Sequence, residues 1–221
     1  GMTETSPLGT VYAKKRGMED FSTEEVTALQ LLQGRGVFGI EMRIVDENNT
    51  ELPWDGVASG ALKVRGPWVA KGYFGLSDTP GHEDCPVDES GWFNTGDVAA
   101  ITPEGFLQIT DRTKDVIKSG GEWISSIEIE NAAVNHPDIA EAAVIGRFHP
   151  KWTERPLLIA VAQQGKTLQK SDVLEFLNDK LHKMALPDDV VFTDELPHTA
   201  TGKINKLGLR ETYKDYSFPE A

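Results

Sequence analysis

Hydrophobic and polar positions alternate over short stretches in the first half of the chain. Within residues 37–46, every second residue from Ile40 to Ile44 is apolar, and the polar Glu41 and Arg43 lie between them. This period of two predicts a half-buried strand. Further strands are expected at 61–65, 98–101 and 106–110. Because segments rich in Gly, Pro and Asp separate these stretches, the chain up to about Thr110 is predicted to form a small β-barrel or meander.

Helical patterns alternate with strand patterns after about residue 112. Ser125 and Glu128 form a capping-box signal, which predicts a helix that ends at His136-Pro137. Ser171 is expected to cap a second helix, which stops before Pro187. The remaining expected elements are strands at 139–146, 157–162 and 190–192 and a final helix at 206–213.

The change of pattern places a domain boundary near Arg112–Lys114. The predicted fold class is α+β, with a β-rich domain over residues 1–112 and a compact α+β domain over 113–221. Residues 34–39 match the glycine pattern of dinucleotide-binding loops. A helical pattern precedes this segment and a strand pattern follows it, which is the reverse of what a pyrophosphate site needs. We interpret it as a turn into a strand.

Charge and cysteine content narrow the classes of partner. The 221 residues carry 22 basic and 35 acidic side chains, a formal charge of -13. Such an excess of acidic side chains argues against binding to nucleic acid, because that requires clustered cations, and against adsorption to an anionic membrane surface. Cys85 is the single cysteine, so a reducing compartment such as the cytoplasm is expected. No apolar stretch approaches the roughly 18 residues of a transmembrane helix.

Four short segments stand out together as candidates for chemistry: Gly1–Thr5, Asn94–Asp97, Asp111–Glu122 and Thr199–Lys203. Each is a weak signal alone, because Thr-Gly-Asp and Thr-Gly-Lys usually lie in turns. In this order and spacing they resemble the later signature motifs of the adenylate-forming superfamily, which includes acyl-CoA synthetases, luciferases and the adenylation domains of peptide synthetases. Residues 120–126 and 149–156 are particularly similar to fatty acyl-CoA synthetases.

The resemblance covers essentially the whole chain but only part of the family's length. Members run to more than twice this length and carry an upstream loop, rich in Ser, Thr and Gly and ending in Lys, that holds the triphosphate. Nothing in this sequence matches that loop. The resemblance therefore implies a C-terminal fragment: a remnant β-barrel subdomain of the large domain, followed by a mobile lid domain. We expect the fragment to need the missing N-terminal half for activity.

The resemblance also implies a reaction and its residues. A fatty or similar carboxylic acid attacks ATP to give an acyl adenylate, and CoA then displaces AMP. By resemblance, Lys203 is the catalytic cation of the first step, Glu4 holds Mg²⁺, and Thr3 contacts phosphate. Asp97 and Arg112 are implied to bind the ribose of ATP and AMP. Each role fits its side chain, since hard Mg²⁺ prefers carboxylate oxygen and cations offset the charge that builds on phosphoryl oxygens.

Two further features follow from the same resemblance. Lys114 occupies the family's hinge position, where the C-terminal domain rotates between the two steps. The loop of Lys118, Gly120, Gly121 and Glu122 is then implied to face CoA. Glycines there would let the slender pantetheine arm pass close to the backbone.

Two alternatives stay open at this stage. A related ligase could pass its acyl group to a carrier protein instead of CoA, because the motifs are shared. A non-catalytic module descended from a truncated gene would also fit, because half of the family's length is missing.

Overall fold

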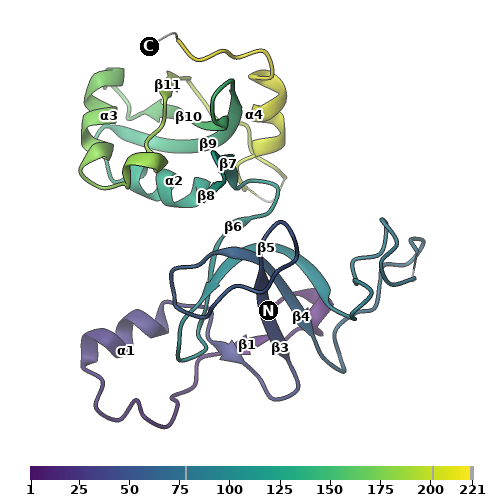
Figure 1. Ribbon diagram of the computed structural model, residues 1–221. Helices are drawn as coiled ribbons and strands as arrows, with labels where there is room; N and C mark the ends of the chain where they lie inside the picture. The colour runs from purple at the N-terminus through teal and green to yellow at the C-terminus, as the bar shows by residue number, and fades with distance from the viewer. Residues whose placement is uncertain (78, 201, 220–221) are drawn as a thin grey trace. The chain divides into compact units, whose positions relative to one another are not determined.

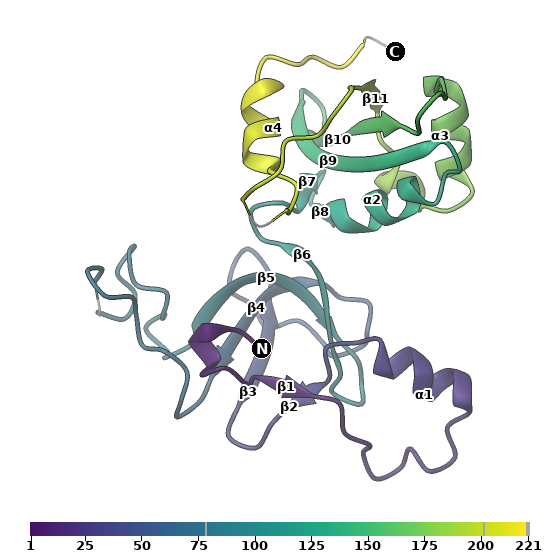
Figure 2. The same cartoon turned by 180° about the vertical axis from the view of Figure 1, so that it is seen from behind.

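The computed structural model describes residues 1–77, 79–200 and 202–219. The chain divides into two compact units, an N-terminal unit of Gly1–Thr113 and a C-terminal unit of Lys114–Ala221. Each unit has its own sheet and its own hydrophobic core (Figures 1 and 2).

An antiparallel sheet of four strands forms the centre of the N-terminal unit, in the order β3-β4-β5-β6. Alternate residues of β3 and β4, among them Met42, Ile44, Leu62 and Val64, are buried and pack with Phe93. This alternation is the pattern expected for a sheet with one face on a core. The strands are β3 (Glu41–Val45), β4 (Gly60–Arg65), β5 (Phe93–Ile101) and β6 (Leu107–Arg112).

Smaller elements surround this sheet. A 3₁₀ turn, η1 (Thr3–Thr5), opens the chain, and β1 (Thr10–Val11) pairs with β2 (Arg35–Gly36). Helix α1 (Thr23–Gln30) lies between these two strands in the sequence. Its N-cap Ser22 accepts a hydrogen bond from the Glu25 amide at 3.2 Å, and the Glu25 carboxylate accepts one from the Ser22 amide at 2.7 Å. This reciprocal pair satisfies two donors that the helix start leaves free.

A long antiparallel hairpin of β9 (Ile139–His149) and β10 (Thr153–Ala162) organises the C-terminal unit. Strand β11 (Asp189–Phe192) pairs parallel to β10, and β7 (Ile117–Ser119) joins β10 to β8 (Glu122–Ile124). Residues on one face of β10, such as Leu158, pack against α2 and α3, whereas Leu157 and Ile159 pack toward α4. Both faces of the hairpin are therefore buried. The helices are α2 (Ser126–Val134), α3 (Lys170–Asn178) and α4 (Lys206–Thr212), with a 3₁₀ turn, η2 (Lys183–Ala185).

The expectation of a mixed fold of helices and strands is confirmed, and so is the helix after Ser125, whose hydroxyl accepts from the Glu128 amide at 3.1 Å. The cap expected at Ser171 is wrong. Helix α3 begins at Lys170, after an extended Gln169, so Ser171 already lies inside the first turn. Its hydroxyl instead donates to Asp172 Oδ1 at 2.9 Å. Among the described residues, no helix is long and apolar enough to cross a bilayer.

Candidate functional site

Asp97 and Arg112 face each other across neighbouring strands of the N-terminal unit. They are register partners on β5 and β6. Arg112 Nη1 lies 3.0 Å from Asp97 Oδ1, and Asp97 is only 8% exposed, whereas the Arg112 side chain is more than half exposed. The arrangement presents a buried carboxylate from one strand and an exposed cation from the next.

Local irregularity of β5 fixes the orientation of Asp97. The pairing of β4 with β5 shifts register between Ala61 and Lys63, and Gly96 has a φ of +73°, a conformation that favours glycine. The Thr95 hydroxyl donates to the Leu62 carbonyl at 2.9 Å and accepts from the Asp97 amide at 3.1 Å. Asn94–Asp97 is therefore a distorted strand segment, where local sequence alone favoured a turn.

Burial raises the pKa of the Asp97 carboxyl above its ordinary value, and the charge of Arg112 offsets this rise only in part. Such a carboxyl destabilises the folded state wherever it is ionised in both states, and the penalty vanishes below the unfolded pKa. We expect Asp97→Asn to raise the melting temperature of this chain at pH 7 and to leave it unchanged near pH 3, as measured by thermal unfolding.

Asp88 provides a control, because its pKa is shifted in the opposite direction from that of Asp97. Burial alone would raise its pKa, but hydrogen bonds from Lys63 and from the Trp92 amide outweigh burial and lower it. Asp88→Asn should therefore lower the melting temperature at pH 7, and the loss should fade as pH falls through the lowered pKa. A melting temperature that drops at pH 7 in the Asp97→Asn variant would contradict the account given for that residue.

Thr3 and Glu4 lie on the η1 turn, beside the same pocket as Asp97. Met2 and Thr5, which flank them, line a cavity of about 60 Å³ together with Asp97. The turn is rigidly held, because the buried Thr5 hydroxyl donates to the Pro7 carbonyl at 2.8 Å. The N-terminal unit thus brings Asp97 and the residues that flank Thr3 and Glu4 to one cavity, whose lining does not include Thr3, Glu4 or Arg112.

The Glu4 carboxylate is held by a residue that sequence reasoning missed. Tyr73 Oη donates to Glu4 Oε1 at 2.8 Å, and this hydrogen bond raises the pKa of Tyr73. The Ala70 amide donates to the Glu4 carbonyl at 2.8 Å. These partners are more than sixty residues away along the chain, so no local motif could have indicated them.

The surroundings of Glu4 suit a Mg²⁺ ion held by one carboxylate better than a metal ion enclosed by several protein ligands. Within residues 1–77, 79–200 and 202–219, no three His, Cys, Asp or Glu side chains gather as a possible metal cluster. Mg²⁺ is usually held by one or two carboxylates, with substrate phosphates and water completing its shell. A single oriented carboxylate with one oxygen engaged by Tyr73 is compatible with that mode of binding.

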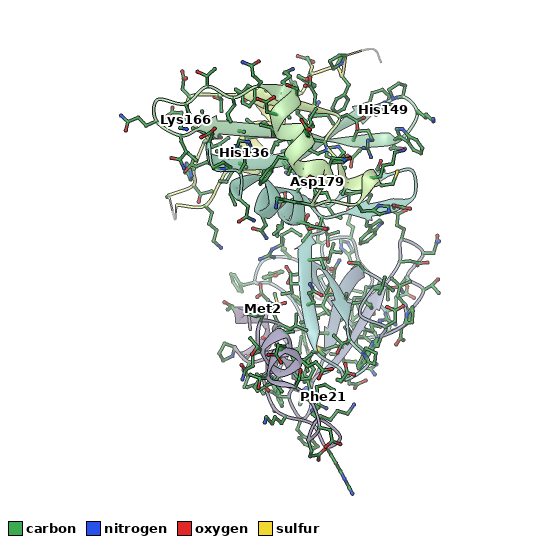
Figure 3. The ribbon with its side chains drawn as sticks, turned by 90° about the vertical axis from the view of Figure 1, so that its left-hand side faces the viewer. Met2, Phe21, His136, His149, Lys166 and Asp179 are labelled. Atoms are coloured by element: carbon green, nitrogen blue, oxygen red, sulfur yellow. The ribbon has the colours of Figure 1, made fainter. Side chains whose placement is uncertain are left out.

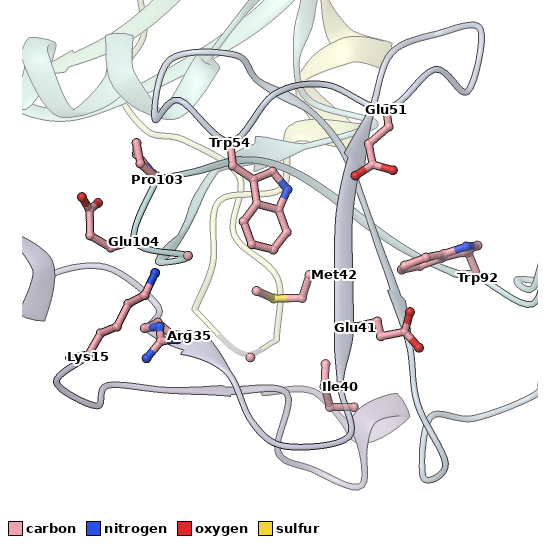
Figure 4. A pocket seen from close by; sticks show the side chains of 12 residues that line it. Lys15, Arg35, Ile40, Glu41, Met42, Glu51, Trp54, Trp92, Pro103 and Glu104 are labelled. Carbon is pink, nitrogen blue, oxygen red and sulfur yellow. The ribbon is translucent and has the colours of Figure 1, made fainter. Parts of the chain in front are cut away.

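A larger pocket of about 480 Å³ lies elsewhere in the N-terminal unit. Its lining combines the cations Lys15 and Arg35 with Glu104, Trp54 and Met42 (Figure 4). The residues that line it include none of the predicted site residues. Its mixture of acids and bases does not define a ligand, so we do not assign it to the site.

The C-terminal unit begins at Lys114, the predicted hinge. Arg210 Nη2 donates to the Lys114 carbonyl at 2.9 Å and lies 2.6 Å from Asp115 Oδ1. The first residues of this unit are therefore fastened to α4.

The hairpin of β7 and β8 carries Lys118 on β7, Gly120 and Gly121 in its turn, and Glu122 at the start of β8. Gly120 and Gly121 have φ values of +59° and +90°. A Cβ on Gly120 would lie 2.7 Å from Trp152 Cε3, whereas a Cβ on Gly121 would meet nothing within 4 Å. Gly120 is thus required by packing, and Gly121 leaves open space on its outer side.

The other two predicted residues of this hairpin, Lys118 and Glu122, are both exposed. The Lys118 ammonium lies over the Trp123 ring at 5.2 Å, and its amide donates to Glu154 Oε2 at 3.0 Å. Glu122 pairs with Ser119 at the end of the β7–β8 ladder.

Lys203 lies on an exposed turn immediately before α4. The Thr199 amide donates to the Lys203 carbonyl at 2.7 Å, which closes the turn. Thr201, part of the predicted motif, lies outside the described residues. Among the described residues, none forms an ion pair with the Lys203 ammonium.

Arg155 is a second residue that sequence reasoning did not single out. Its buried guanidinium donates to Asp188 Oδ1 at 2.7 Å, to Ser119 Oγ at 3.2 Å, and to the carbonyls of Met184 and Leu186 at 2.7 and 2.9 Å. It therefore fixes the strand that leads into the Gly120–Gly121 turn. Its partners come from two segments, β7 and residues 184–188, which only the folded chain brings together.

Two family profiles match the chain. The profile described as AMP-binding enzyme matches residues 1–74, and the profile described as AMP-binding enzyme C-terminal domain matches residues 128–203. The chain belongs to the AMP-binding enzymes of the adenylate-forming superfamily and corresponds to their C-terminal part.

Named relatives agree with this assignment. The chain is 51% identical to a 3-methylmercaptopropionyl-CoA ligase of Ruegeria lacuscaerulensis, over 97% of this chain and 39% of the relative. It is 47% identical to a medium-chain-fatty-acid–CoA ligase of Ectopseudomonas oleovorans, over 97% and 38%. The solved structure of ATP-bound MatB from Rhodopseudomonas palustris matches with a TM-score of 0.76 at 32% identity, over 97% of this chain and 40% of that one. The chain thus spans about two fifths of the length of these proteins.

Proposed function

We propose that this chain is part of an ATP-dependent acid–CoA ligase that activates a fatty or similar carboxylic acid as its acyl adenylate and transfers the acyl group to CoA. The observation that supports this most directly is the buried Asp97 carboxylate, which pairs with Arg112 at 3.0 Å and lines a cavity together with Met2 and Thr5, the residues on either side of Thr3 and Glu4. Relatives named as CoA ligases at about 50% identity support the same reaction class.

In the first proposed step, a carboxylate oxygen of the acid attacks the α-phosphorus of ATP, and pyrophosphate leaves. Asp97 accepts hydrogen bonds from the ribose hydroxyls, and Arg112 can leave its ion pair to bind on the other side of the ribose. Thr3 contacts phosphate, and Lys203 places its ammonium against the oxygens on which charge develops. Glu4 would hold Mg²⁺, which supplies further offset of that charge when it is bound.

In the second proposed step, the thiolate sulfur of CoA attacks the acyl carbon, and AMP leaves with the oxygen that linked it to the acyl group. Rotation at Lys114 exchanges the Lys203 turn for the Gly120–Gly121 turn at the reacting centre. The open outer side of Gly121 suits passage of the pantetheine arm close to the backbone. Lys118 and Glu122 flank this passage.

The proposal is tested by acid-dependent exchange of pyrophosphate into ATP. The 221-residue chain alone is expected to show none. The chain joined to the upstream part of the Ectopseudomonas relative should exchange with fatty acids, and the intact relative is the positive control. The same assay with free CoA, or with a carrier protein bearing phosphopantetheine, then identifies the acceptor.

Two results would contradict the proposal. Exchange by the chain alone would mean that the triphosphate site is complete within it. A folded but silent chimera, beside an active relative, would favour a module without catalytic function.

A further inference from the structure

A largely buried ion pair joins α4 to α2 within the C-terminal unit. Lys206 Nζ lies 2.8 Å from Glu130 Oε1, and the two side chains are only 14% and 16% exposed. The same ammonium donates to Ser126 Oγ at 2.7 Å, and Ser126 is fully buried. Lys206 therefore contacts two residues, Ser126 and Glu130, that lie about one helical turn apart on the same side of α2.

Glu130 extends this connection into the sheet. Its Oε1 also accepts a hydrogen bond from the Val144 amide of β9 at 2.7 Å. Removing two charges from water is expensive, and a buried pair is often no more stabilising than apolar side chains of the same volume. What the pair supplies here is a fixed geometry, since one ammonium is aligned with groups that belong to α2 and, through Glu130, to β9.

Lys203 lies three residues before this anchor. The hydrogen bonds of its own turn are local: the Thr199 amide donates to the Lys203 carbonyl at 2.7 Å, and the Asn205 amide donates to the Pro197 carbonyl at 2.7 Å. The turn is also tied to the sheet, because Ile204 packs against the core cluster of β9, β10 and α4, and His198 Nε2 lies 3.6 Å from Glu141 Oε1 of β9. The side chain of Lys206 connects the end of the turn to a second, rigid element.

The Gly120–Gly121 turn is held in a different way. The Gly120 amide donates to the Trp152 carbonyl at 2.9 Å, and Ser119 pairs with Thr153 of β10. Its supports therefore come from β10 and the β9–β10 connection rather than from α4. A disturbance of the Lys206 anchor should reach the Lys203 turn and leave this other turn in place.

We propose that Lys206 is a positioning residue for Lys203: its buried contacts with Glu130 and Ser126 aim the Lys203 turn for the adenylation step. The inference rests on the proposed function only for the consequence in catalysis. The anchoring of the turn itself can be measured without any reaction.

The first test uses the 221-residue chain as it stands. Lys206→Met alone would leave the largely buried Glu130 carboxylate without its cation and risk misfolding. It is therefore combined with Glu130→Gln, because the amide oxygen of glutamine can still accept the hydrogen bond from the Val144 amide. Hydrogen exchange of the Thr199 and Asn205 amides, followed by NMR, should become about tenfold faster in the double variant. Lys206→Arg, which keeps a cation on the same partners, should exchange like the parent chain. Unchanged exchange in the double variant would overturn the inference.

The second test measures the two half-reactions in the chimera that carries the upstream part of the Ectopseudomonas relative. The double variant should form acyl adenylate about 10–100-fold more slowly, because a misplaced catalytic group loses rate steeply. It should convert preformed acyl adenylate to thioester at the parent rate. An equal fall in the rates of both half-reactions would show a general structural effect and would overturn the positioning role of Lys206.

Failure of the proposed function would look different. If Lys203→Ala itself left adenylation unchanged, the role given to Lys203 would be wrong, whatever the exchange data showed. If Lys203→Ala slowed adenylation and the double variant did not, only the role given to Lys206 would be overturned.

Discussion

Lys203→Ala is expected to slow acyl-adenylate formation by about 10²–10³-fold, the loss seen when a single group that stabilises transition-state charge is removed. Conversion of preformed acyl adenylate to thioester should stay within about twofold of the parent rate, because the proposed rotation at Lys114 takes Lys203 out of the site for that step. Both rates are measured in the chimera with the upstream part of the Ectopseudomonas relative.

Lys166 offers a matched control for this substitution. It is an exposed lysine of the same unit, in an ion pair with Asp138 at 2.8 Å, and its side chain points away from the ribbon (Figure 3). Lys166→Ala should leave both half-reactions unchanged. Equal losses in the Lys166→Ala and Lys203→Ala variants would mean that overall charge, and not the position of one cation, governs the adenylation step.

Gly121→Leu is expected to have the second largest effect, on the thioester step. A side chain at this position would project into open space, where the proposal places the pantetheine arm. The rate of thioester formation from preformed acyl adenylate should fall by about 10²-fold or more, because displacement of the reacting groups by about 1 Å already costs that much. Adenylation should be little affected.

The variant Gly165→Leu is a control that distinguishes obstruction of the pantetheine arm from the effect of backbone strain. It lies on the loop between β10 and α3, its φ is +77°, and an added Cβ there also meets nothing within 4 Å. Gly121→Leu and Gly165→Leu should each lose about 1–3 kcal/mol of unfolding free energy, the usual strain of a side chain in this conformation. Only the first should slow thioester formation. If the Gly121→Leu variant formed thioester at the parent rate, the proposed passage of the pantetheine arm beside this turn would be wrong.

Most strands and helices could be predicted because local patterns determine them. The alternation in 37–46 predicted a strand, and β3 is found at Glu41–Val45. It begins later than expected because Gly39 has a φ of +94°, which interrupts an extended backbone. The short strands β1, β2, β7 and β8 were missed, since two or three residues carry no measurable period and pairing with a distant strand forms them.

The sequence named the candidate site residues, but it could not supply their neighbours. Asp97 and Arg112 were named separately, and only the register of β5 against β6 pairs them. Tyr73 and Lys206 have no motif of their own. Their importance arises from Glu4 and Glu130, residues far away in the chain. The residue roles and the limits of the two functional domains stay predictions.

The packing of Trp152 against Gly120 has an optical consequence. The chain has five tryptophans, and the two in the C-terminal unit, Trp123 and Trp152, both flank the Gly120–Gly121 turn. With Trp54, Trp68 and Trp92 replaced by phenylalanine, all remaining tryptophan emission would originate beside this turn. Indole fluorescence responds to nearby charge and hydration, so the arrival of CoA that the proposed function places at this turn would be followed in real time without any attached dye.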